Sequence, residues 1–207
     1  MRVTNAGAPV AVVCVNGGQG RAVPGTWSAT LEWLVAHLAP GFPDVAFHEV
    51  RYRVRSWRHL PRCIEDGRAA LDGAAAGGAR RVGLLGFSMG GAVALALAGH
   101  EAVRSYIGLA PWMPDQLPVE PLRGRRVAIR HGALDRYLPG IPGVHPASSR
   151  AGAERARALG IDVDYALVPG SLHAVALRAP WGEPVPLLRS AEWHAFVAGE
   201  VERLRAA

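Results

Sequence analysis

The chain has 207 residues, of which 50% are hydrophobic and 19% are charged. This composition is typical of one globular domain with a buried core, and it excludes an intrinsically disordered or collagen-like chain. The net charge is +6, and the sequence contains no lysine, so every side-chain cation other than histidine is arginine. The arginines are scattered and accompany no nucleic-acid-binding motif, so we expect no nucleic-acid partner.

Short apolar runs predict six β-strands, at Val10 to Val15, Val45 to Val50, Val82 to Leu85, Tyr106 to Leu109, Val127 to Ile129 and Val163 to Val168. Helical patterns separate most of them, at Trp27 to Leu38, Pro61 to Ala76, Gly90 to Gly99, Arg150 to Leu159 and Leu187 to Leu204. Such alternation produces right-handed crossovers and a parallel sheet covered by helices on both faces. We therefore predict a single doubly wound α/β domain over residues 1–207, with a mostly or wholly parallel sheet of about six strands.

The N-terminal apolar run, Val10 to Val15, is too short to span a membrane and is followed by Asn16-Gly17-Gly18 instead of a cleavage site. Cys14 and Cys63 are isolated from one another, which favours reduced, buried thiols over a disulfide framework. These features predict a cytoplasmic protein without a membrane span.

The strand ending near Leu85 is followed by Gly86-Phe87-Ser88-Met89-Gly90, a G-x-S-x-G pattern that opens a helix of small apolar residues. A serine on a sharp strand-to-helix turn needs glycines two residues away on both sides, because a Cβ there would collide with the backbone. The turn also places the hydroxyl at the positive end of a helix. The pattern favours Ser88 as a nucleophile, and the alternative is a glycine-rich turn in which Ser88 only caps the helix.

With this motif in this place, the sequence resembles the α/β-hydrolase family along nearly its whole length, in a minimal form without a cap domain. The segment His131-Gly132-Ala133-Leu134-Asp135 resembles the family's H-G-x-x-D segment, which implies that Asp135 is the triad acid. The segment Pro169 to His173 follows the last strand, where the family places its catalytic histidine. The alternatives are Asp115 as the acid, and a turn role for Asp135 at the start of the Asp-Arg-Tyr-Leu-Pro loop.

The resemblance implies a catalytic role for Ser88, Asp135 and His173, and the chemistry of these side chains is consistent with it. A serine hydroxyl is a poor nucleophile near neutrality, so the neutral imidazole of His173 would take the proton of Ser88, and Asp135 would fix the tautomer of that imidazole. We expect His131 to form hydrogen bonds near the site without acting in catalysis. The remaining histidines show no metal-ligand spacing, and no metal or organic cofactor is implied.

An oxyanion hole needs two backbone N–H donors, which we assign to Met89 and Gly18. The family commonly has His-Gly after the first strand, and here Asn16 takes the place of that histidine. This departure leaves the choice between Gly18 and Gln19 open. A glycine-rich turn without a catalytic role is the alternative for this segment.

The segment from Ala110 to Arg126 is short and rich in proline, too short for a helical lid. We therefore expect an open, shallow site for small or accessible acyl groups. Trp112 is a candidate wall of the acyl pocket or an ordinary packing residue.

The basic cluster Arg51, Arg53, Arg55, Arg58 and Arg62 fits a solvent face better than a substrate site. If Arg55 or Arg58 turns toward the catalytic mouth, an ester bearing a carboxylate or phosphate becomes a candidate substrate.

We predict a serine hydrolase that cleaves a small carboxylic ester or thioester through an acyl-enzyme on Ser88. Acyl transfer and peptidase action remain open. The alternative from another class is a non-catalytic binding protein that keeps the fold, because fold alone does not establish activity. The sequence leaves the acyl chain, the leaving group and the oligomeric state undetermined.

Overall fold

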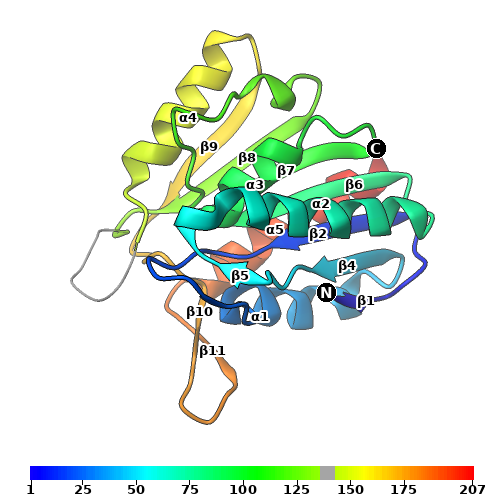
Figure 1. Ribbon diagram of the computed structural model, residues 1–207, viewed down its shortest axis with the longest axis horizontal. Coiled ribbons are helices and arrows are strands. Elements are labelled where there is room, and N and C mark those ends of the chain that lie inside the picture. The colour runs from blue at the N-terminus through cyan, green and yellow to red at the C-terminus, as the bar shows by residue number, and fades with distance from the viewer. Residues whose placement is uncertain (136–142) are drawn as a thin grey trace.

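A seven-stranded sheet forms the centre of the molecule in the computed structural model, which describes residues 1–135 and 143–207 (Figure 1). In spatial order its strands are β1 (Arg2–Thr4), β4 (Val45–Glu49), β2 (Val10–Val15), β6 (Arg81–Phe87), β7 (Val103–Leu109), β8 (Arg126–Gly132) and β9 (Val163–Val168). All the predicted strands are confirmed, and they are parallel to one another. The edge strand β1 was not predicted because it is short and only half-buried, and it pairs antiparallel with β4.

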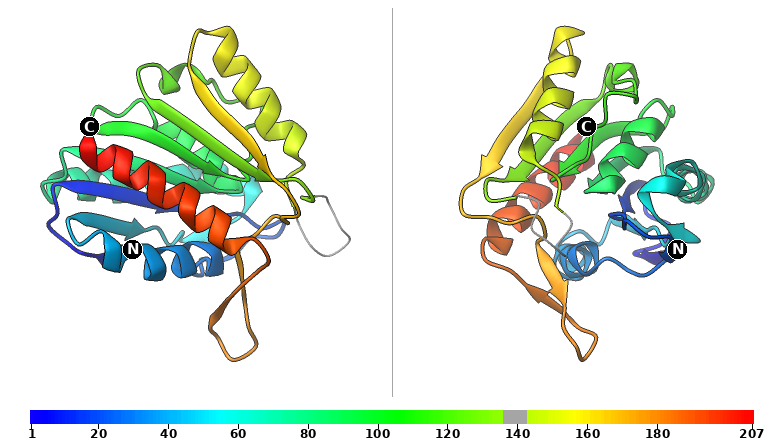
Figure 2. Two further views of the ribbon diagram at one scale, coloured as in Figure 1. Left: turned by 180° about the vertical axis from the view of Figure 1, so that it is seen from behind. Right: turned by 60° about the vertical axis from the view of Figure 1, so that its left-hand side comes forward.

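Helices cover both faces of the sheet, which confirms the predicted doubly wound architecture. They are α1 (Ala29–Leu38), α2 (Leu60–Ala76), α3 (Met89–Leu97), α4 (Pro146–Ala158) and α5 (Ser190–Ala206). In Figure 1, α2, α3 and α4 lie in front of the sheet, and the left view of Figure 2 shows α1 and α5 on the opposite face. The loop after Asp135 that the sequence predicted falls largely in residues 136–142, outside the described residues.

Three helix starts differ from the prediction by two or more residues, among them α5, which begins at Ser190 rather than Leu187. The other two have local reasons. The hydroxyl of Ser28 accepts a hydrogen bond from the N–H of Leu31, so α1 begins at Ala29 and Trp27 lies before the helix. His145 accepts a hydrogen bond from Ala147 and Pro146 occupies the first turn, so α4 begins earlier than the predicted Arg150. The later start of α1 matters for the site, because it places Trp27 in a loop.

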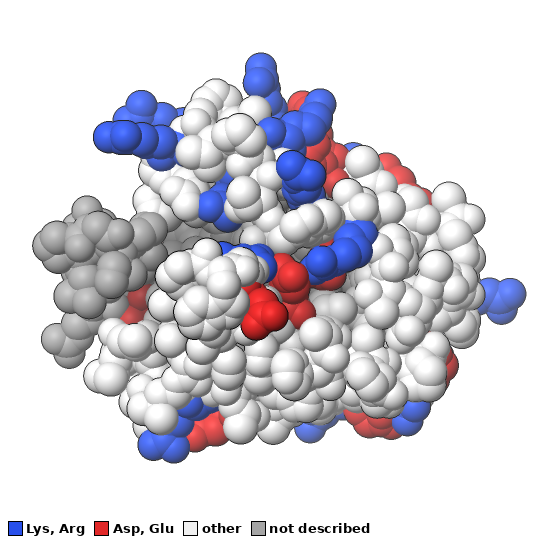
Figure 3. Space-filling view, turned by 90° about the horizontal axis from the view of Figure 1, so that it is seen from below, with Lys and Arg blue, Asp and Glu red and all other residues white. Residues whose placement is uncertain are grey.

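Charged side chains are spread over the surface. On the face shown in Figure 3, arginines lie at several separate places, and acidic residues lie beside many of them. Arg126, for example, donates to the buried carboxylate of Glu200, with an Nε–Oε2 distance of 2.7 Å. None of the helices in the described parts of the chain combines the length and the apolar composition needed to cross a lipid bilayer.

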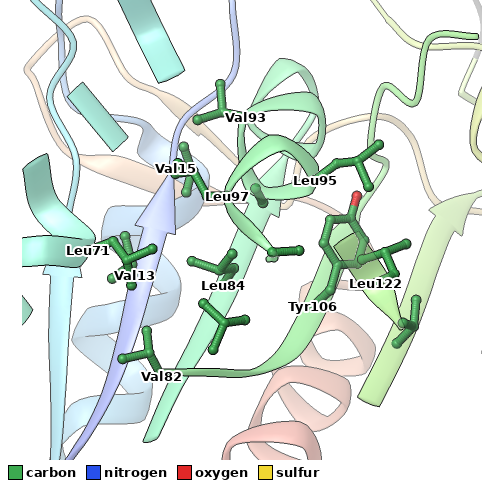
Figure 4. Close-up of a cluster of buried hydrophobic side chains, with 14 of the residues drawn as sticks. Val13, Val15, Leu71, Val82, Leu84, Val93, Leu95, Leu97, Tyr106 and Leu122 are labelled. Carbon is green, nitrogen blue, oxygen red and sulfur yellow. The ribbon is translucent and has the colours of Figure 1, made fainter. Parts of the chain in front are cut away.

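The core consists of two apolar layers, one on each face of the sheet. Val13 and Val15 point into the layer beneath α2 and α3, whereas Val12 and Cys14 point into the layer beneath α1 and α5. This alternation follows from the two-residue period of a strand, and it explains why the central strands are apolar at every position. Figure 4 shows part of the first layer, in which side chains of α3 meet those of β2 and β6. Cys14 and Cys63 are free and buried, as predicted.

Several short elements complete the fold. β3 (Val23–Pro24) pairs with β5 (Val54–Arg55), β10 (Ala176–Arg178) pairs with β11 (Pro184–Pro186), and the 3-10 helices are η1 (Ala39–Gly41), η2 (Trp57–His59) and η3 (Glu120–Leu122). The β10–β11 hairpin extends below the sheet in Figure 1. It was not predicted, because its strands are only three residues long and mostly exposed.

The hairpin is attached to α1 through one buried hydroxyl. Thr30 Oγ1 accepts hydrogen bonds from the N–H groups of Val175 and Ala176, at 3.2 and 3.4 Å, and donates to the carbonyl of Ala176 at 3.2 Å. Thr30 is 1% exposed, so water does not replace a lost partner.

We predict that Thr30→Val lowers the free energy of unfolding by about 1–3 kcal/mol, because two buried N–H groups lose their acceptor while the side-chain volume is kept. Urea denaturation of the wild type, Thr30→Val and Thr30→Ser measures this, and Thr30→Ser, which keeps the hydroxyl, is the control. Equal stability of the valine and serine variants would contradict the role of the hydroxyl.

Candidate active site

Ser88 lies on the turn between β6 and α3 with a backbone conformation that non-glycine residues rarely adopt, φ 56° and ψ −122°. Hydrogen bonds hold this turn in place: the N–H of Ser88 donates to Leu109 O at 3.0 Å, and its carbonyl accepts from Gly91 and Trp112 at 2.9 and 2.8 Å. A strained conformation of this kind costs about 1–3 kcal/mol and persists only where its surroundings enforce it. The geometry is that expected of the G-x-S-x-G motif.

The two motif glycines permit close backbone approaches. A Cβ on Gly86 would lie 2.6 Å from the carbonyl oxygen of Gly90, and a Cβ on Gly90 would lie 2.1 Å from the carbonyl oxygen of Val15. Both distances are far below van der Waals contact, so any side chain at these positions displaces backbone. The sequence argument for these glycines is therefore confirmed.

Asp135 and His173 meet beyond the carboxyl ends of β8 and β9. His173 Nδ1 lies 2.5 Å from Asp135 Oδ2, and the carboxylate is 1% exposed. Burial alone would raise the pKa of Asp135, but hydrogen bonds from His131 and His173 outweigh burial and lower it. Asp135 is therefore ionised near neutral pH and holds the Nδ1 proton of His173, which leaves Nε2 of that ring available as a base.

His131 is a second imidazole on the same carboxylate oxygen. Its Nε2 lies 2.9 Å from Asp135 Oδ2 and 2.7 Å from the carbonyl oxygen of Val144. Both partners are acceptors, so we assign the proton to Nε2. Its Nδ1 lies 2.7 Å from the hydroxyl of Ser149. His131 is fully buried, and it contacts the acid as the sequence analysis expected.

Ser88, Asp135 and His173 line one pocket. The ring of Phe87, next to Ser88, lies 5.0 Å from the imidazole of His173, measured between centroids. Within the described residues Ser88 Oγ forms no hydrogen bond, so its hydroxyl is not hydrogen-bonded to His173 in this structure. Hydrogen bonds between a serine and a neighbouring base are often long without a ligand and shorten when one binds. Asp115, the alternative acid, is exposed and pairs with Arg155, and it is not among the residues that line the pocket.

The loop after β2 packs closely against the serine turn. A Cβ on Gly18 would lie 2.2 Å from the Trp57 ring and 2.5 Å from the sulfur of Met89, and a Cβ on Gly17 would lie 3.3 Å from the Cβ of Ser88. Neither the N–H of Met89 nor that of Gly18 donates a hydrogen bond within the described residues, whereas the N–H of Gly17 donates to Asn16 Oδ1 at 2.6 Å. The carbonyl of Gln19 accepts from Trp57, which ties this residue to the neighbouring segment.

Asn16, which departs from the family pattern, supports this loop. It is 2% exposed, and its Nδ2 donates to the carbonyl of Thr26 at 2.9 Å. The main-chain carbonyl of Asn16 accepts a hydrogen bond from the hydroxyl of Tyr52 at 2.8 Å. The side chain therefore connects two loops at the rim of the pocket and contributes to their positions.

The pocket is larger than the expected shallow site, with a volume of about 860 Å³. Sequence reasoning missed two of its walls: the loop before α1, which contains Trp27, and the β10–β11 hairpin, which contributes Leu177 and Arg178. Neither wall comes from the segment between β7 and β8, which the sequence analysis considered too short for a lid. The prediction that this segment carries no helical lid is confirmed, since its one helical turn is η3.

The three candidate substrate-contact residues, Arg55, Arg58 and Trp112, have different positions in the structure. Arg55 lines the pocket, whereas Arg58 and Trp112 do not. The ring of Trp112 instead lies against that of Trp57, with centroids 6.5 Å apart, and Trp57, like Trp27, lines the pocket. The packing interpretation of Trp112 is therefore the one the structure supports.

Solved structures with similar shapes are α/β hydrolases. A putative α/β hydrolase of unknown function from Agrobacterium tumefaciens matches with a TM-score of 0.67 and 16% identity, covering 98% of this chain and 89% of that chain. A serine hydrolase without a lid from Xanthomonas campestris gives 0.56 and 18%, covering 80% and 73%. Esterase PE8 gives 0.56 and 21%, covering 93% and 92%. No protein-family profile and no curated protein matches the sequence. The chain therefore has the α/β-hydrolase fold.

We predict that Gly90→Ala lowers the free energy of unfolding by about 1–3 kcal/mol, because the added methyl group overlaps the carbonyl of Val15. Gly99→Ala is the matched control, since its Cβ would lie 3.7 Å from the nearest atom, a Pro121 carbon, in ordinary contact. Its stability should change by less than about 1 kcal/mol. Urea denaturation compares the two, and equal effects would refute the close approach.

Proposed function

We propose that this protein is a serine hydrolase that cleaves a carboxylic ester or thioester through an acyl-enzyme on Ser88. The observation that carries the proposal is the contact between His173 Nδ1 and the buried carboxylate of Asp135, at the rim of the pocket that Ser88 lines. A carboxylate behind an imidazole, close to a serine on a strained turn, is the arrangement that activates a hydroxyl. Similar folds that carry the names esterase and serine hydrolase support the same reading.

In the proposed mechanism, Nε2 of His173 removes the proton of Ser88 as the hydroxyl oxygen attacks the carbonyl carbon of the substrate. The resulting oxyanion accepts hydrogen bonds from the N–H groups of Met89 and Gly18. Breakdown of the tetrahedral intermediate expels the alcohol or thiol, which takes the proton from the imidazolium. A water molecule, deprotonated by the same imidazole, then attacks the acyl-enzyme and releases the acid and Ser88.

A non-catalytic binding protein and an acyltransferase or peptidase are the competing functions. Reaction with a fluorophosphonate distinguishes an enzyme from a non-catalytic binding protein, because a serine hydroxyl that is not activated does not react with this probe. Hydrolysis of a small ester in water, without an added acyl acceptor, distinguishes a hydrolase from an obligate acyltransferase.

We expect a fluorophosphonate probe to label the protein once, on Ser88, and Ser88→Ala to abolish both labelling and hydrolysis of short nitrophenyl esters. Ser105→Ala is the matched control, because Ser105 is also a buried serine and its hydroxyl has no partner among the described residues. Intact-mass and peptide mass spectrometry locate the label. Full turnover by a folded Ser88→Ala variant would overturn the proposal.

His131 is a positioning residue in this mechanism. We predict that His131→Leu lowers kcat about 10- to 100-fold, because Asp135 loses a charge-assisted hydrogen bond. The pKa of Asp135, which the hydrogen bond from His131 lowers, should then rise, so that on acidification activity is lost at a higher pH than in the wild type. His131→Gln, which keeps an N–H donor, should restore part of both properties. An unchanged pH profile in His131→Leu would show that His131 only fills space.

A further inference from the structure

The arginines that follow β4 divide between two environments. Arg53 is exposed, and its guanidinium pairs with Glu65 and Asp66 on α2, with nitrogen–oxygen distances of 2.8 and 2.6 Å. Arg51, also exposed, and Arg55, half-buried, lie two residues before and after it and line the pocket that holds Ser88. Residues two apart on a regular strand share one face, so the separation of Arg53 from the other two reflects the bend of the chain at position 53. We call Arg51 and Arg55 the arginine pair.

The arginine pair has no carboxylate partner. Arg51 Nε donates to the carbonyl of Gly25 at 2.8 Å, while Arg55 Nε is buried and has no acceptor among the described residues. Burial lowers the pKa of Arg55, as expected for a cation withdrawn from water without a counter-charge. Residues 136–142, outside the described range, have the sequence RYLPGIP and include no acidic side chain.

The other charged side chains of the described lining are paired or hydrogen-bonded. Arg178 pairs with Glu32 at 2.6 Å, so these two lining residues cancel each other. Asp135 is shared by His131 and His173. Among the arginines of the described lining, the arginine pair therefore lacks a counter-charge: Arg51 is exposed, and Arg55 is half-buried with no acceptor for its Nε. A guanidinium partly withdrawn from water is stabilised when an anion reaches it.

The pocket also has room and apolar surface for a substrate longer than a simple acetate. Its volume is about 860 Å³, and Trp27, Trp57 and Leu177 contribute to its walls. The planar guanidinium of arginine suits compact oxyanions, since it offers several N–H donors in one plane.

We propose that the arginine pair is an anion subsite that selects esters carrying a carboxylate or a phosphate at the end remote from the scissile bond. The inference rests on the proposed hydrolase function. In a bound substrate, Arg55 and Arg51 hold the remote oxyanion while the ester carbonyl lies at Ser88. The hydrolysed products are then a dicarboxylic or phosphorylated acid, or an anionic alcohol, together with the other half of the ester.

The test compares kcat/KM for a carboxylate-bearing ester, nitrophenyl hemiglutarate, with that for its neutral counterpart of equal length, nitrophenyl valerate. We expect the wild type to prefer the anionic ester, and Arg55→Gln to lower this preference about tenfold or more, chiefly through KM. Arg55→Lys, which keeps the charge, should retain part of it. Arg53→Gln is the matched control and should leave the preference unchanged. A wild type without preference, or equal effects of Arg53→Gln and Arg55→Gln, would overturn the proposal.

A binding measurement separates this inference from the proposed function. Calorimetric titration of Ser88→Ala with glutarate and with inorganic phosphate measures the subsite without catalysis, and the stronger ligand identifies the anion class. Binding that Arg55→Gln weakens supports the subsite even if the protein hydrolyses no ester. Absence of binding by both anions, in a protein that does hydrolyse nitrophenyl valerate, would refute the subsite and leave the hydrolase proposal standing.

Discussion

The buried carboxylate of Asp135 positions the two histidines of the site, because one of its oxygens accepts hydrogen bonds from both imidazoles. A carboxylate this buried remains ionised only if hydrogen bonds offset its burial; His131 and His173 donate to Oδ2, whereas Oδ1 has no partner among the described residues. The three residues come from two neighbouring strand ends, β8 and β9, which lie side by side in the sheet. The parallel register thus sets where the imidazole lies relative to the serine turn after β6. The proposed chemistry depends on that placement.

A second constraint acts on the serine itself. Ser88 has a positive φ between β6 and α3, and the close backbone approaches at Gly86 and Gly90 leave no room for a Cβ at either position. The loop after β2 lies beside this turn, since a Cβ on Gly17 would lie 3.3 Å from the Cβ of Ser88. Ser88 lines the pocket, and the N–H groups of Met89 and Gly18 have no acceptor within the described residues.

Much of this arrangement could be predicted from the sequence, because glycine spacing and strand ends are local signals. The turn at Ser88 follows from such signals, whereas Asp135 and His173 were assigned through the resemblance to the α/β-hydrolase family. The pocket could not be predicted in the same way. The β10–β11 hairpin forms one wall of the pocket, and its position depends on a tertiary contact through Thr30. The strands of this hairpin are short and mostly exposed, so the sequence shows no hydrophobic periodicity that predicts them. Likewise, the spacing of Arg51, Arg53 and Arg55 favoured one common face, and their separation in the structure accompanies a bend at position 53 that the spacing does not predict.

The central claim is that Ser88, His173 and Asp135 act as one unit with the amides of Met89 and Gly18. The most direct test is a crystal structure of the protein after reaction with a fluorophosphonate. The account predicts phosphorus bonded to Ser88 Oγ, one phosphonyl oxygen about 3 Å from the N–H groups of Met89 and Gly18, and His173 Nε2 within hydrogen-bond reach of the adduct. An adduct on another residue, or one whose oxygen faces solvent with His173 turned away, would contradict it.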